Sequence, residues 1–284
     1  MSKPPLILCA GLVALDMEFS VTSFPQAGLK HKAQGAAMKA AGGALNASAA
    51  IVALGGQAWL RAALGDDPLA ELMLTGIRAR GVEQQGVVRI PGQITPHSAI
   101  LIQPDGERTI INYRDDALCD GMPPLPQDLS FDAVLCDTRF PALSVPALNM
   151  ARQAGKPAVL DAEAPVDLMS DTLAAASHIA FSQQGLLDYT GACSVETLGQ
   201  VARQLGRWVC VTQGPDPVLC HDGLRSYAIP VPAAQIANSN GAGDFWHGAF
   251  TLALALGQSE QAAVTSANAS TARFLSGQII ERLI

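Results

Sequence analysis

Short apolar runs alternate with segments of helical periodicity along most of this chain. The apolar runs predict strands at 6–11, 58–62, 133–136, 158–160, 178–181 and 208–212, and the periodic segments predict helices at 44–54, 68–80, 145–154, 166–175, 195–205 and 245–256. Strands this short and continuously apolar are typical of a sheet that helices cover on both faces. The pattern therefore predicts an α/β protein, a three-layer α/β/α sandwich with a mostly parallel central sheet.

One block departs from this alternation. Residues 97–103 and 108–114 are rich in β-forming residues and are joined by Pro104-Asp105-Gly106-Glu107, which has the chemistry of a turn. The polar residues Asn112 and Arg114 fall at the exit of this predicted hairpin. We therefore expect a small β-sheet lid, formed by roughly 13–39 and 92–116 and inserted in a single domain that spans 1–284. An ordinary antiparallel excursion at a sheet edge is the alternative.

Composition narrows the class of protein. Of the 284 residues, 49% are hydrophobic and 15% charged, which excludes a disordered chain. The net charge is −7 and the 18 basic residues form no cluster, so we expect no nucleic-acid partner and no membrane surface. The six cysteines show no C-x-x-C pair, and no leader or membrane span is expected. These features favour a reduced, cytoplasmic protein.

The segment with the most chemistry is Asn238-Ser239-Asn240-Gly241-Ala242-Gly243-Asp244, just before a predicted helix. Its glycines leave backbone N–H groups at a helix N-terminus open to an anion, and Asp244 adds a carboxylate at the same point. Phosphoryl transfer to a hydroxyl needs both a phosphate site and a base. The alternative is a plain glycine-rich helix start. A dinucleotide fingerprint would need glycine at 246, where the chain has Trp246, and no Walker-type phosphate loop is present.

Residues 238–250 (NSNGAGDFWHGAF) resemble the C-terminal signature of the ribokinase-like, or PfkB-type, carbohydrate kinases, Asp-Thr-x-Gly-Ala-Gly-Asp-x-Phe-x-Gly-Ala. Gly42-Gly43-Ala44-Leu45-Asn46 resembles the N-terminal signature of the same family, so the resemblance covers essentially the whole chain. It implies a ribokinase-like fold and an ATP- and Mg²⁺-dependent sugar kinase. In such a kinase Asp244 is the catalytic base, and the amides of Gly241, Ala242 and Gly243 form the anion hole.

The resemblance also implies residues for binding both substrates. It assigns Asp16, Gly42, Gly43 and Asn46 to the sugar, Thr212 and Gly214 to the ATP phosphates, and Asn268 to the adenine pocket. Each has a simpler reading from the residues alone. Asp16 and the 212–214 segment could be turns, Asn46 a helix cap and Asn268 an exposed helix residue.

The chain departs from the family pattern at two acidic positions. Asn238 replaces the signature's first Asp, and Ser239 replaces its Thr. Where many members have Asn-x-x-Glu, this chain has Ser182 and Gly185. No metal ligand is therefore assigned, and a catalytically weak sugar or nucleotide sensor on the same fold is a second hypothesis.

Four further segments resemble the bacterial sulfofructose kinases: 106–113, 137–140, 151–155 with 159–161, and 180–182 with 185–186. This resemblance implies transfer to the 1-hydroxyl of 6-deoxy-6-sulfofructose, with Lys30, Asn112 and Arg139 holding the sulfonate. An ionised sulfonate offers three acceptor oxygens, which suits such a cradle. Fructose, fructose-6-phosphate, ribose or a 2-keto sugar acid are alternative substrates. A nucleoside suits an anion cradle less well, and the open edges of the lid strands make a homodimer a further expectation.

Overall fold

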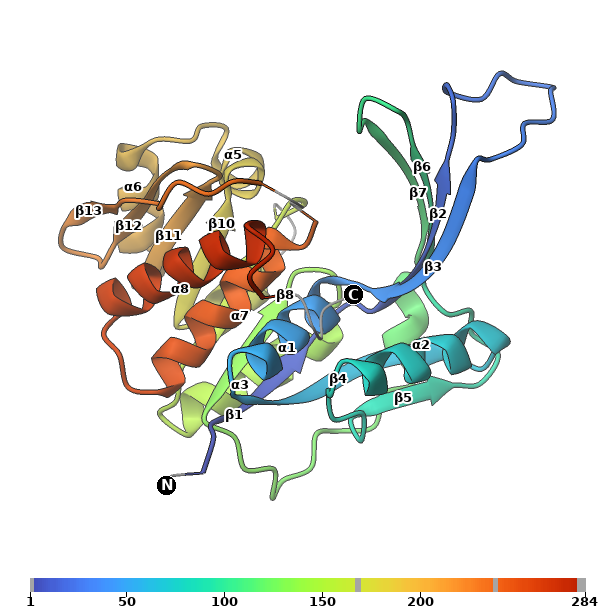
Figure 1. The fold of residues 1–284 in the computed structure, drawn as a ribbon. Helices are drawn as coiled ribbons and strands as arrows, with labels where there is room; N and C mark the ends of the chain where they lie inside the picture. Colours follow the sequence, from blue (N-terminus) through green and yellow to red (C-terminus); the bar gives the residue numbers. More distant parts are fainter. Residues whose placement is uncertain (1–2, 167–169, 237–239, 280–284) are drawn as a thin grey trace.

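The computed structural model describes residues 3–166, 170–236 and 240–279, and its largest element is a nine-stranded sheet (Figure 1). Its strands, in spatial order, are β13 (Ser226–Ile229), β12 (Asp216–His221), β11 (Trp208–Gln213), β10 (His178–Ser182), β9 (Ala158–Ala162), β8 (Ala133–Asp137), β1 (Leu6–Ala10), β4 (Gln57–Gly65) and β5 (Val87–Ile90). Only the pairings of β12 with β11 and with β13 are antiparallel. A mostly parallel sheet is thus confirmed.

Helices cover both faces of this sheet. One face packs against α1 (Gly43–Ala53), α2 (Pro68–Ala79), α7 (Ala242–Ala255) and α8 (Glu260–Leu275); the other packs against α3 (Pro141–Gln153), α4 (Ser170–Ala175), α5 (Gln183–Thr190) and α6 (Val195–Leu205). Within β1, Ile7 and Cys9 lie in the first core, whereas Leu8 and Ala10 lie in the second. Because successive side chains of a strand point to opposite faces, a strand buried on both sides must be apolar throughout. The predicted three layers are confirmed.

Four strands form a separate, smaller sheet that projects away from the main body, called the lid sheet below (Figure 1). Its order is β3 (Gly35–Ala41), β2 (Ala14–Ser20), β6 (His97–Ile102) and β7 (Arg108–Tyr113). The hairpin predicted around 104–107 is confirmed as the antiparallel pair β6–β7, and residues 13–39 supply the second antiparallel pair, β2–β3. A parallel β2–β6 pairing joins the two hairpins.

One carboxylate joins the start of α2 to the segment that enters the lid sheet. Asp67 is the N-cap of α2 and accepts a hydrogen bond from the Ala70 amide at 3.1 Å, next to Pro68 at the first helical position. The same side chain accepts from the Thr95 amide at 2.8 Å and from the Thr95 hydroxyl at 2.7 Å. The base of the lid sheet is therefore fixed to the main body through a local helix-capping interaction.

The predicted elements occur within a few residues of their expected positions, with two corrections. Helix α3 begins at Pro141 rather than 145, because proline is favoured in the first turn of a helix. Val166, expected to begin a helix, is not helical; its amide donates to Asp188 at 2.7 Å, while 167–169 lie outside the described residues.

The sequence analysis missed α5, β5, β12, β13 and a 3₁₀ turn at Asp116–Cys119. Among the described helices, none combines the length and apolarity needed to cross a bilayer.

Candidate active site

The N-terminus of α7 presents backbone donors with no side chain covering them. Gly241 is its N-cap, with a left-handed φ of 70° that favours glycine, and no side chain caps the helix. The first helical bond runs from the Phe245 amide to the Gly241 carbonyl at 2.8 Å. Among the described residues, no acceptor is paired with the amides of Ala242, Gly243 or Asp244. A Cβ on Gly243 would meet nothing within 4 Å, so no neighbouring part of the described chain crowds the turn at that position.

Asp244 lies in the first turn of α7 and accepts a hydrogen bond from Asn46 Nδ2 at 2.8 Å. Burial raises the pKa of the Asp244 carboxyl from 3.8 to about 6; the Asn46 bond opposes this rise, while the nearby charges of Glu163 and Asp137 add to it. A carboxylate whose pKa lies near neutrality is suited to accept a proton from an alcohol. The candidate base and the open amides therefore belong to one helix turn.

Two glycines at the start of α1 allow close packing on both sides: Gly42 against residues 12–14 and Gly43 beside Asp244. Gly42 has φ 102°, and a Cβ on it would lie 2.5 Å from the Leu12 carbonyl oxygen. A Cβ on Gly43 would lie 3.3 Å from Asp244 Oδ1 and 3.7 Å from Asp137 Oδ2. Gly42 thus permits close backbone packing, and Gly43 leaves room beside the candidate base.

Further carboxylates lie at the carboxyl ends of the central strands. Asp137 ends β8 and accepts from the amides of Leu12 at 2.7 Å and Arg139 at 2.9 Å, which fixes two loops at the site. In β9, Asp161 lies 3.3 Å from His247 Nδ1, and burial together with the charge of Asp244 raises the Asp161 pKa well above its usual value. Within the described part of the chain, no three His, Cys, Asp or Glu side chains are arranged to hold a metal ion.

The structure gives a physical reason for one departure from the family pattern. Gly185 lies in the first turn of α5, where its amide donates to the Ser182 hydroxyl at 2.9 Å. A Cβ on Gly185 would lie only 2.0 Å from the Ala162 carbonyl oxygen. The backbone therefore leaves no room for an acidic side chain at 185. Asn238 and Ser239, the other departures, lie outside the described residues.

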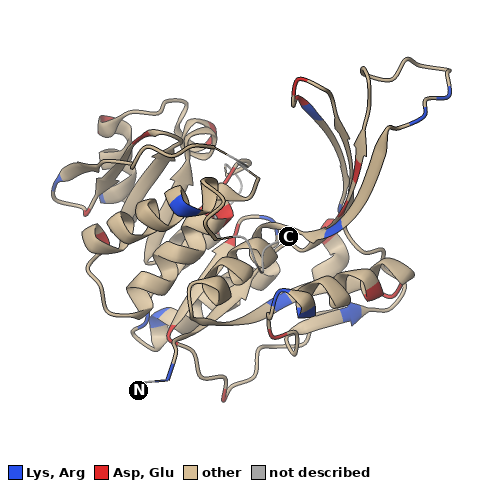
Figure 2. Ribbon diagram, in the orientation of Figure 1, with Lys and Arg blue, Asp and Glu red and all other residues tan. Residues whose placement is uncertain are grey.

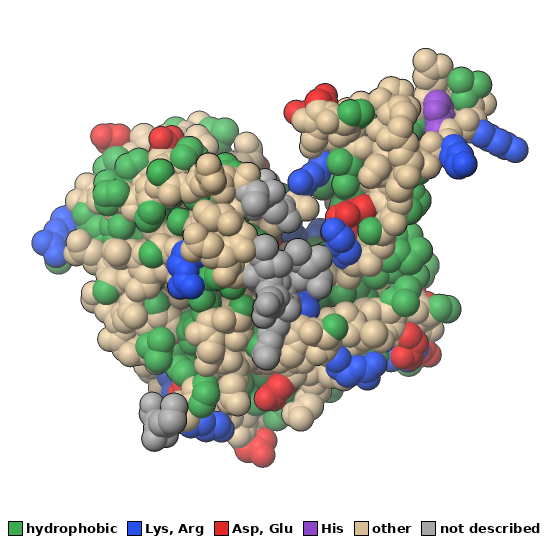
Figure 3. Space-filling view, in the orientation of Figure 1, with side chains coloured by type: hydrophobic (Ala, Val, Ile, Leu, Met, Phe, Trp, Pro, Cys, Tyr) green, Lys and Arg blue, Asp and Glu red, His purple; other side chains and the backbone are tan. Residues whose placement is uncertain are grey.

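A cavity of about 290 Å³ lies between the lid sheet and the main body, where acidic and basic side chains border a hollow (Figure 3). Figure 2 shows both acidic and basic residues along the strands of the lid sheet, including near its base. The main body contributes Gly241 and the stacked rings of Phe245 and Phe274, whose centroids are 4.6 Å apart. The charged residues that line the cavity are Asp16, Glu18, Lys39, Arg80 and Arg108.

Strand register sets the inner face of the lid sheet. Asp16 pairs with Lys39 on one side and with Ser98 on the other, and Ser98 pairs with Asn112. Burial raises the pKa of Asp16, and a hydrogen bond with Ser98 opposes the rise. The predicted sugar ligands Asp16 and Asn112 therefore lie in one row across the sheet, on the face toward the cavity.

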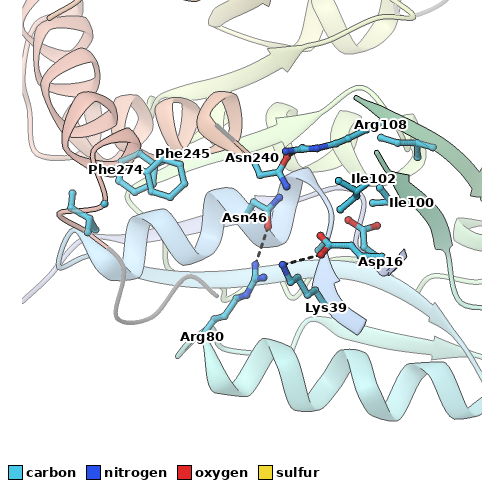
Figure 4. A pocket seen from close by; sticks show the side chains of 16 residues that line it. Asp16, Lys39, Asn46, Arg80, Ile100, Ile102, Arg108, Asn240, Phe245 and Phe274 are labelled. Atoms are coloured by element: carbon cyan, nitrogen blue, oxygen red, sulfur yellow. Dashed lines mark hydrogen bonds and ion pairs between the residues drawn. The ribbon is translucent and has the colours of Figure 1, made fainter. Parts of the chain in front are cut away.

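The guanidinium of Arg80 donates from Nη1 to Asn46 Oδ1 at 2.9 Å (Figure 4). Because Asn46 also donates to Asp244, its amide links Arg80 to the candidate base. Across the cavity, Lys39 pairs with Glu18 at 3.1 Å, and Arg108 of the lid sheet donates to Asn240, the residue before Gly241. The hydrogen bond between Arg108 and Asn240 thus links the lid sheet directly to the start of α7.

The three residues predicted to hold a sulfonate do not line this cavity. Lys30 is exposed in the loop between β2 and β3, and Asn112 lies on β7. Arg139 follows β8, and its guanidinium donates to the Ala164 carbonyl at 2.7 Å and to the Glu163 carboxylate at 2.6 Å. The described structure therefore does not assemble them into a cradle.

The residues predicted to bind the nucleotide lie on β11, in the turn that follows it and on α8. Thr212 is the penultimate residue of β11, with its hydroxyl 3.4 Å from the Phe181 carbonyl, and Gly214 makes the turn into β12 with φ 64°. Asn268 on α8 is buried and not exposed: it accepts from Trp246 Nε1 at 2.8 Å and donates to the Pro230 carbonyl at 3.0 Å. Both ends of the Asn268 amide therefore bond within the protein. An adenine-binding role for Asn268 stays a prediction.

Sequence analysis missed Lys39, Arg80 and Arg108 as cavity residues. Lys39 carried a usable signal, since alternation along 35–41 places it on the same face as Ala41, two residues along. Arg80 carried none, because a basic residue at the end of a helix is ordinary.

A family model described as "pfkB family carbohydrate kinase" matches residues 4–275. The chain belongs to the pfkB family of carbohydrate kinases. This pfkB-family chain is 23% identical to a ribokinase of Arabidopsis thaliana over 278 residues, which are 91% of this chain and 72% of that protein. It is 37% identical to fructokinase-1 of rice over 79 residues, 28% of this chain and 24% of that protein.

Two solved structures are similar over almost the full length of this pfkB-family chain. The first is a protein of Agrobacterium tumefaciens that is provisionally described as a ribokinase. It is 31% identical to this chain, and the two align with a TM-score of 0.89 over 96% of this chain and 92% of that one. The second is the Arabidopsis ribokinase in complex with ribose and ATP, 21% identical, with a TM-score of 0.83 over 99% and 95% of the two chains. The fold is therefore ribokinase-like.

Proposed function

We propose that this chain is an ATP-dependent sugar kinase that transfers the γ-phosphoryl group of ATP to a primary hydroxyl of a ketose. The observation that carries the proposal is the first turn of α7. There, a carboxylate with a pKa of about 6 adjoins backbone amides that have no acceptor among the described residues, and Gly241 of the same turn lines the cavity. A phosphate needs such donors, and a hydroxyl nucleophile needs such a base.

In the proposed reaction, Asp244 accepts the proton of the sugar hydroxyl as its oxygen bonds to the γ-phosphorus. The bond from the γ-phosphorus to the β-phosphate oxygen breaks, and ADP leaves with that electron pair. The amides of Ala242 and Gly243, after the Gly241 cap, are aimed where the charge of the transferring group develops. The lid sheet excludes water, which would otherwise compete with the sugar for the phosphoryl group.

The residues at the start of α7 fit a polyphosphate. The bare Gly243 leaves space beside the amides, and the positive end of the helix dipole favours an anion. Thr212 and Gly214 are proposed to lie along the phosphates and Asn268 near the adenine. Mg²⁺ is proposed to arrive with ATP and to neutralise phosphate charge, because this ion is commonly held by one or two carboxylates plus the phosphates themselves. Asp137, Asp161 and Glu163 are among the carboxylates whose charges interact with Asp244, but no three such side chains of the described residues are arranged to hold a metal ion, so no ligand is assigned.

The finer proposal for the acceptor is 6-deoxy-6-sulfofructose, phosphorylated at C1. Its support is the resemblance of segments 106–113 and 137–140, with Asn112 in the same lid row as Asp16. To complete a sulfonate site, Arg139 would have to leave Glu163 and Ala164, and Lys30 would have to approach from its exposed loop. A neutral ketose such as fructose is the second candidate, favoured because the Arg139 guanidinium is already bound to Glu163 and Ala164.

A competition of acceptors separates these candidates. Purified protein with Mg-ATP is offered 6-deoxy-6-sulfofructose, fructose-6-phosphate, fructose and ribose, and ADP release and the phosphorylated product are measured. We expect the sulfonate sugar to give the highest kcat/KM and Arg139→Lys to lower that preference, with Lys32→Met, an exposed change beside Lys30, as the control. Preference for neutral fructose would reject the anion site. Retained ATP binding without turnover on any sugar would support the sensor hypothesis.

We also propose that two copies pair through the lid sheet. Its outer face exposes apolar side chains, with Met38 65% and Ile111 64% exposed, and both β3 and β7 are edge strands. Sedimentation velocity on the wild type and on Met38→Lys tests the pairing. A dimer that the substitution dissociates is expected, and a monomeric wild type at micromolar concentration contradicts it.

A further inference from the structure

Arg80 is a buried cation whose side chain ends at the candidate active site. It follows the last residue of α2, is 9% exposed, and lines the cavity beside Asn46. Burial lowers the pKa of its guanidinium, and the charge of Asp16 opposes that change, so Arg80 remains a cation. Its Nη1 donates to Asn46 Oδ1 at 2.9 Å (Figure 4). On its other side, Asn46 Nδ2 donates to Asp244 Oδ2 at 2.8 Å.

The chemistry of the two end groups determines which way the Asn46 amide points. A guanidinium has only donors, so the carbonyl end of the amide must face Arg80. An ionised carboxylate has only acceptors, so the NH₂ end must face Asp244. Without a donor at position 80, the amide could turn its carbonyl toward the carboxyl group, which would favour protonated Asp244. With the donor in place, the amide is held in the orientation that stabilises the ionised base.

We propose that Arg80 is a positioning residue that locks the Asn46 amide so that Asn46 holds Asp244 ionised and oriented for proton transfer. The proposal rests on the proposed kinase function, because it gives Asp244 the role of base. Arg80 itself needs no contact with either substrate. It acts through Asn46, and its effect therefore disappears when Asn46 is absent.

Other charged groups also face Asp244, and the test must account for them. The loop after β9 brings Glu163, β8 brings Asp137 and the loop after it brings Arg139; the first two raise the pKa of Asp244 and Arg139 lowers it. Asp161 in β9 is coupled to Asp244, and His247, one turn along α7, has a pKa lowered to about 4 by burial and is therefore neutral near pH 7. None of these residues changes in the variants below, so a shift in the titration of Asp244 reports on the Arg80–Asn46 pair.

The test compares Arg80→Met, Arg80→Lys, Asn46→Ala and the double variant Asn46→Ala/Arg80→Met. In Arg80→Met we expect the midpoint of the acid side of the kcat–pH profile to rise by about 0.5 to 1 pH unit. This is the shift that the loss of one hydrogen bond would produce. This shift lowers kcat by about 2- to 5-fold at pH 6 and hardly at pH 8, with the sugar KM within about 2-fold of wild type. Arg80→Lys, which keeps a positively charged donor on a differently shaped side chain, should show a smaller shift than Arg80→Met.

The double variant distinguishes positioning from direct contact. If Arg80 acts through Asn46, the double variant shifts the acid limb no further than Asn46→Ala alone. Additive effects, or a higher sugar KM with an unchanged pH midpoint, would mean that Arg80 contacts the sugar and would overturn the proposal. Arg78→Met is the matched control, because Arg78 is an exposed cation on the same helix. Should Arg80→Met not fold, Arg80→Lys is judged by the same two criteria.

A titration that needs no turnover separates this proposal from the proposed function. The carboxyl carbons of aspartate are labelled with ¹³C, the Asp244 signal is assigned from Asp244→Asn, and its midpoint is followed by NMR. An upward shift in Arg80→Met supports positioning even if no sugar is phosphorylated, in which case only the kinase proposal fails. An unchanged midpoint with active kinase would reject the role of Arg80 alone.

Discussion

The start of α7 and the lid cavity form the two ends of the candidate site. The first consists mainly of backbone groups, and the second consists of side chains. At α7 the functional groups are backbone amides and one carboxylate within four consecutive residues, 241–244, and glycine removes the obstacles. The lid end is made of side chains from β2, β3, α2 and β7, which are separated along the chain by up to about 90 residues. All three of its cations already have partners: Lys39 pairs with Glu18, Arg80 donates to Asn46, and Arg108 donates to Asn240.

The contrast suggests a different role for each end of the candidate site. A helix start is made by local sequence, so it keeps its geometry while the rest of the chain varies. A wall of side chains can be altered one residue at a time, which suits it to distinguish one sugar from another. Substitutions at α7 should therefore affect the rate of chemistry, and substitutions at the lid should affect which acceptor is used.

The largest effect is expected from Asp244→Asn, which keeps the shape of the side chain and removes the base. We expect kcat to fall by about 10²- to 10⁴-fold with substrate KM values nearly unchanged, because general base catalysis contributes about that factor. Steady-state kinetics on the preferred sugar measure it, with the exposed Asp216→Asn as control. A fall in kcat of less than about 10-fold would remove Asp244 from the role of base.

Gly243→Ala tests whether the amides at α7 bind phosphate. The added methyl group would point into space where nothing lies within 4 Å, so the protein alone should accept it. Alanine is favoured over glycine in helices by up to about 1 kcal/mol, so thermal stability should hold or rise. We expect kcat/KM for ATP to fall by about 10- to 100-fold, as when a donor to a developing anion is displaced. Unchanged ATP kinetics would place the phosphates elsewhere.

The raised pKa of Asp244 also predicts how stability depends on pH. For an acid whose folded-state pKa lies above 3.8, at about 6, the stabilising contribution is complete below about pH 4 and is lost as the pH rises through 6. Asp244→Asn should therefore be more stable than wild type at pH 8, by about 1–3 kcal/mol, and the difference should shrink at pH 4. Urea unfolding at the two pH values measures it. Equal stability of the two proteins at both values would contradict the raised pKa.

The smallest effect is expected at the lid end. Lys39 is 43% exposed in its 3.1 Å pair with Glu18, so Lys39→Met should change the free energy of unfolding by less than about 1 kcal/mol. The sugar KM should rise by about 2- to 5-fold with kcat unchanged, since a partly screened charge contributes little binding energy. Lys32→Met in the exposed loop serves as control. A fall in kcat as large as that of Gly243→Ala would remove the distinction between the two ends.

Sequence alone determined the layered fold, and it predicted the part of the candidate site at the start of α7. Continuous apolar runs can be buried only in a sheet covered on both faces, and Gly241 to Asp244 carry their geometry in four adjacent residues. Glycine at 42 and 43 indicated a close backbone approach, and the structure places Leu12 and Asp244 beside them.

Tertiary structure alone decided which side chains meet at the lid end. Arg80 reaches Asn46 across 34 residues, and Asn46 reaches Asp244 across 198, because α2, α1 and α7 pack on the same face of the sheet. Arg139 looked available in the sequence, but in the fold it is bonded to Glu163 and Ala164. Local geometry follows from neighbouring residues through backbone preferences, whereas contacts between distant side chains depend on how whole elements pack, and no short motif records that packing.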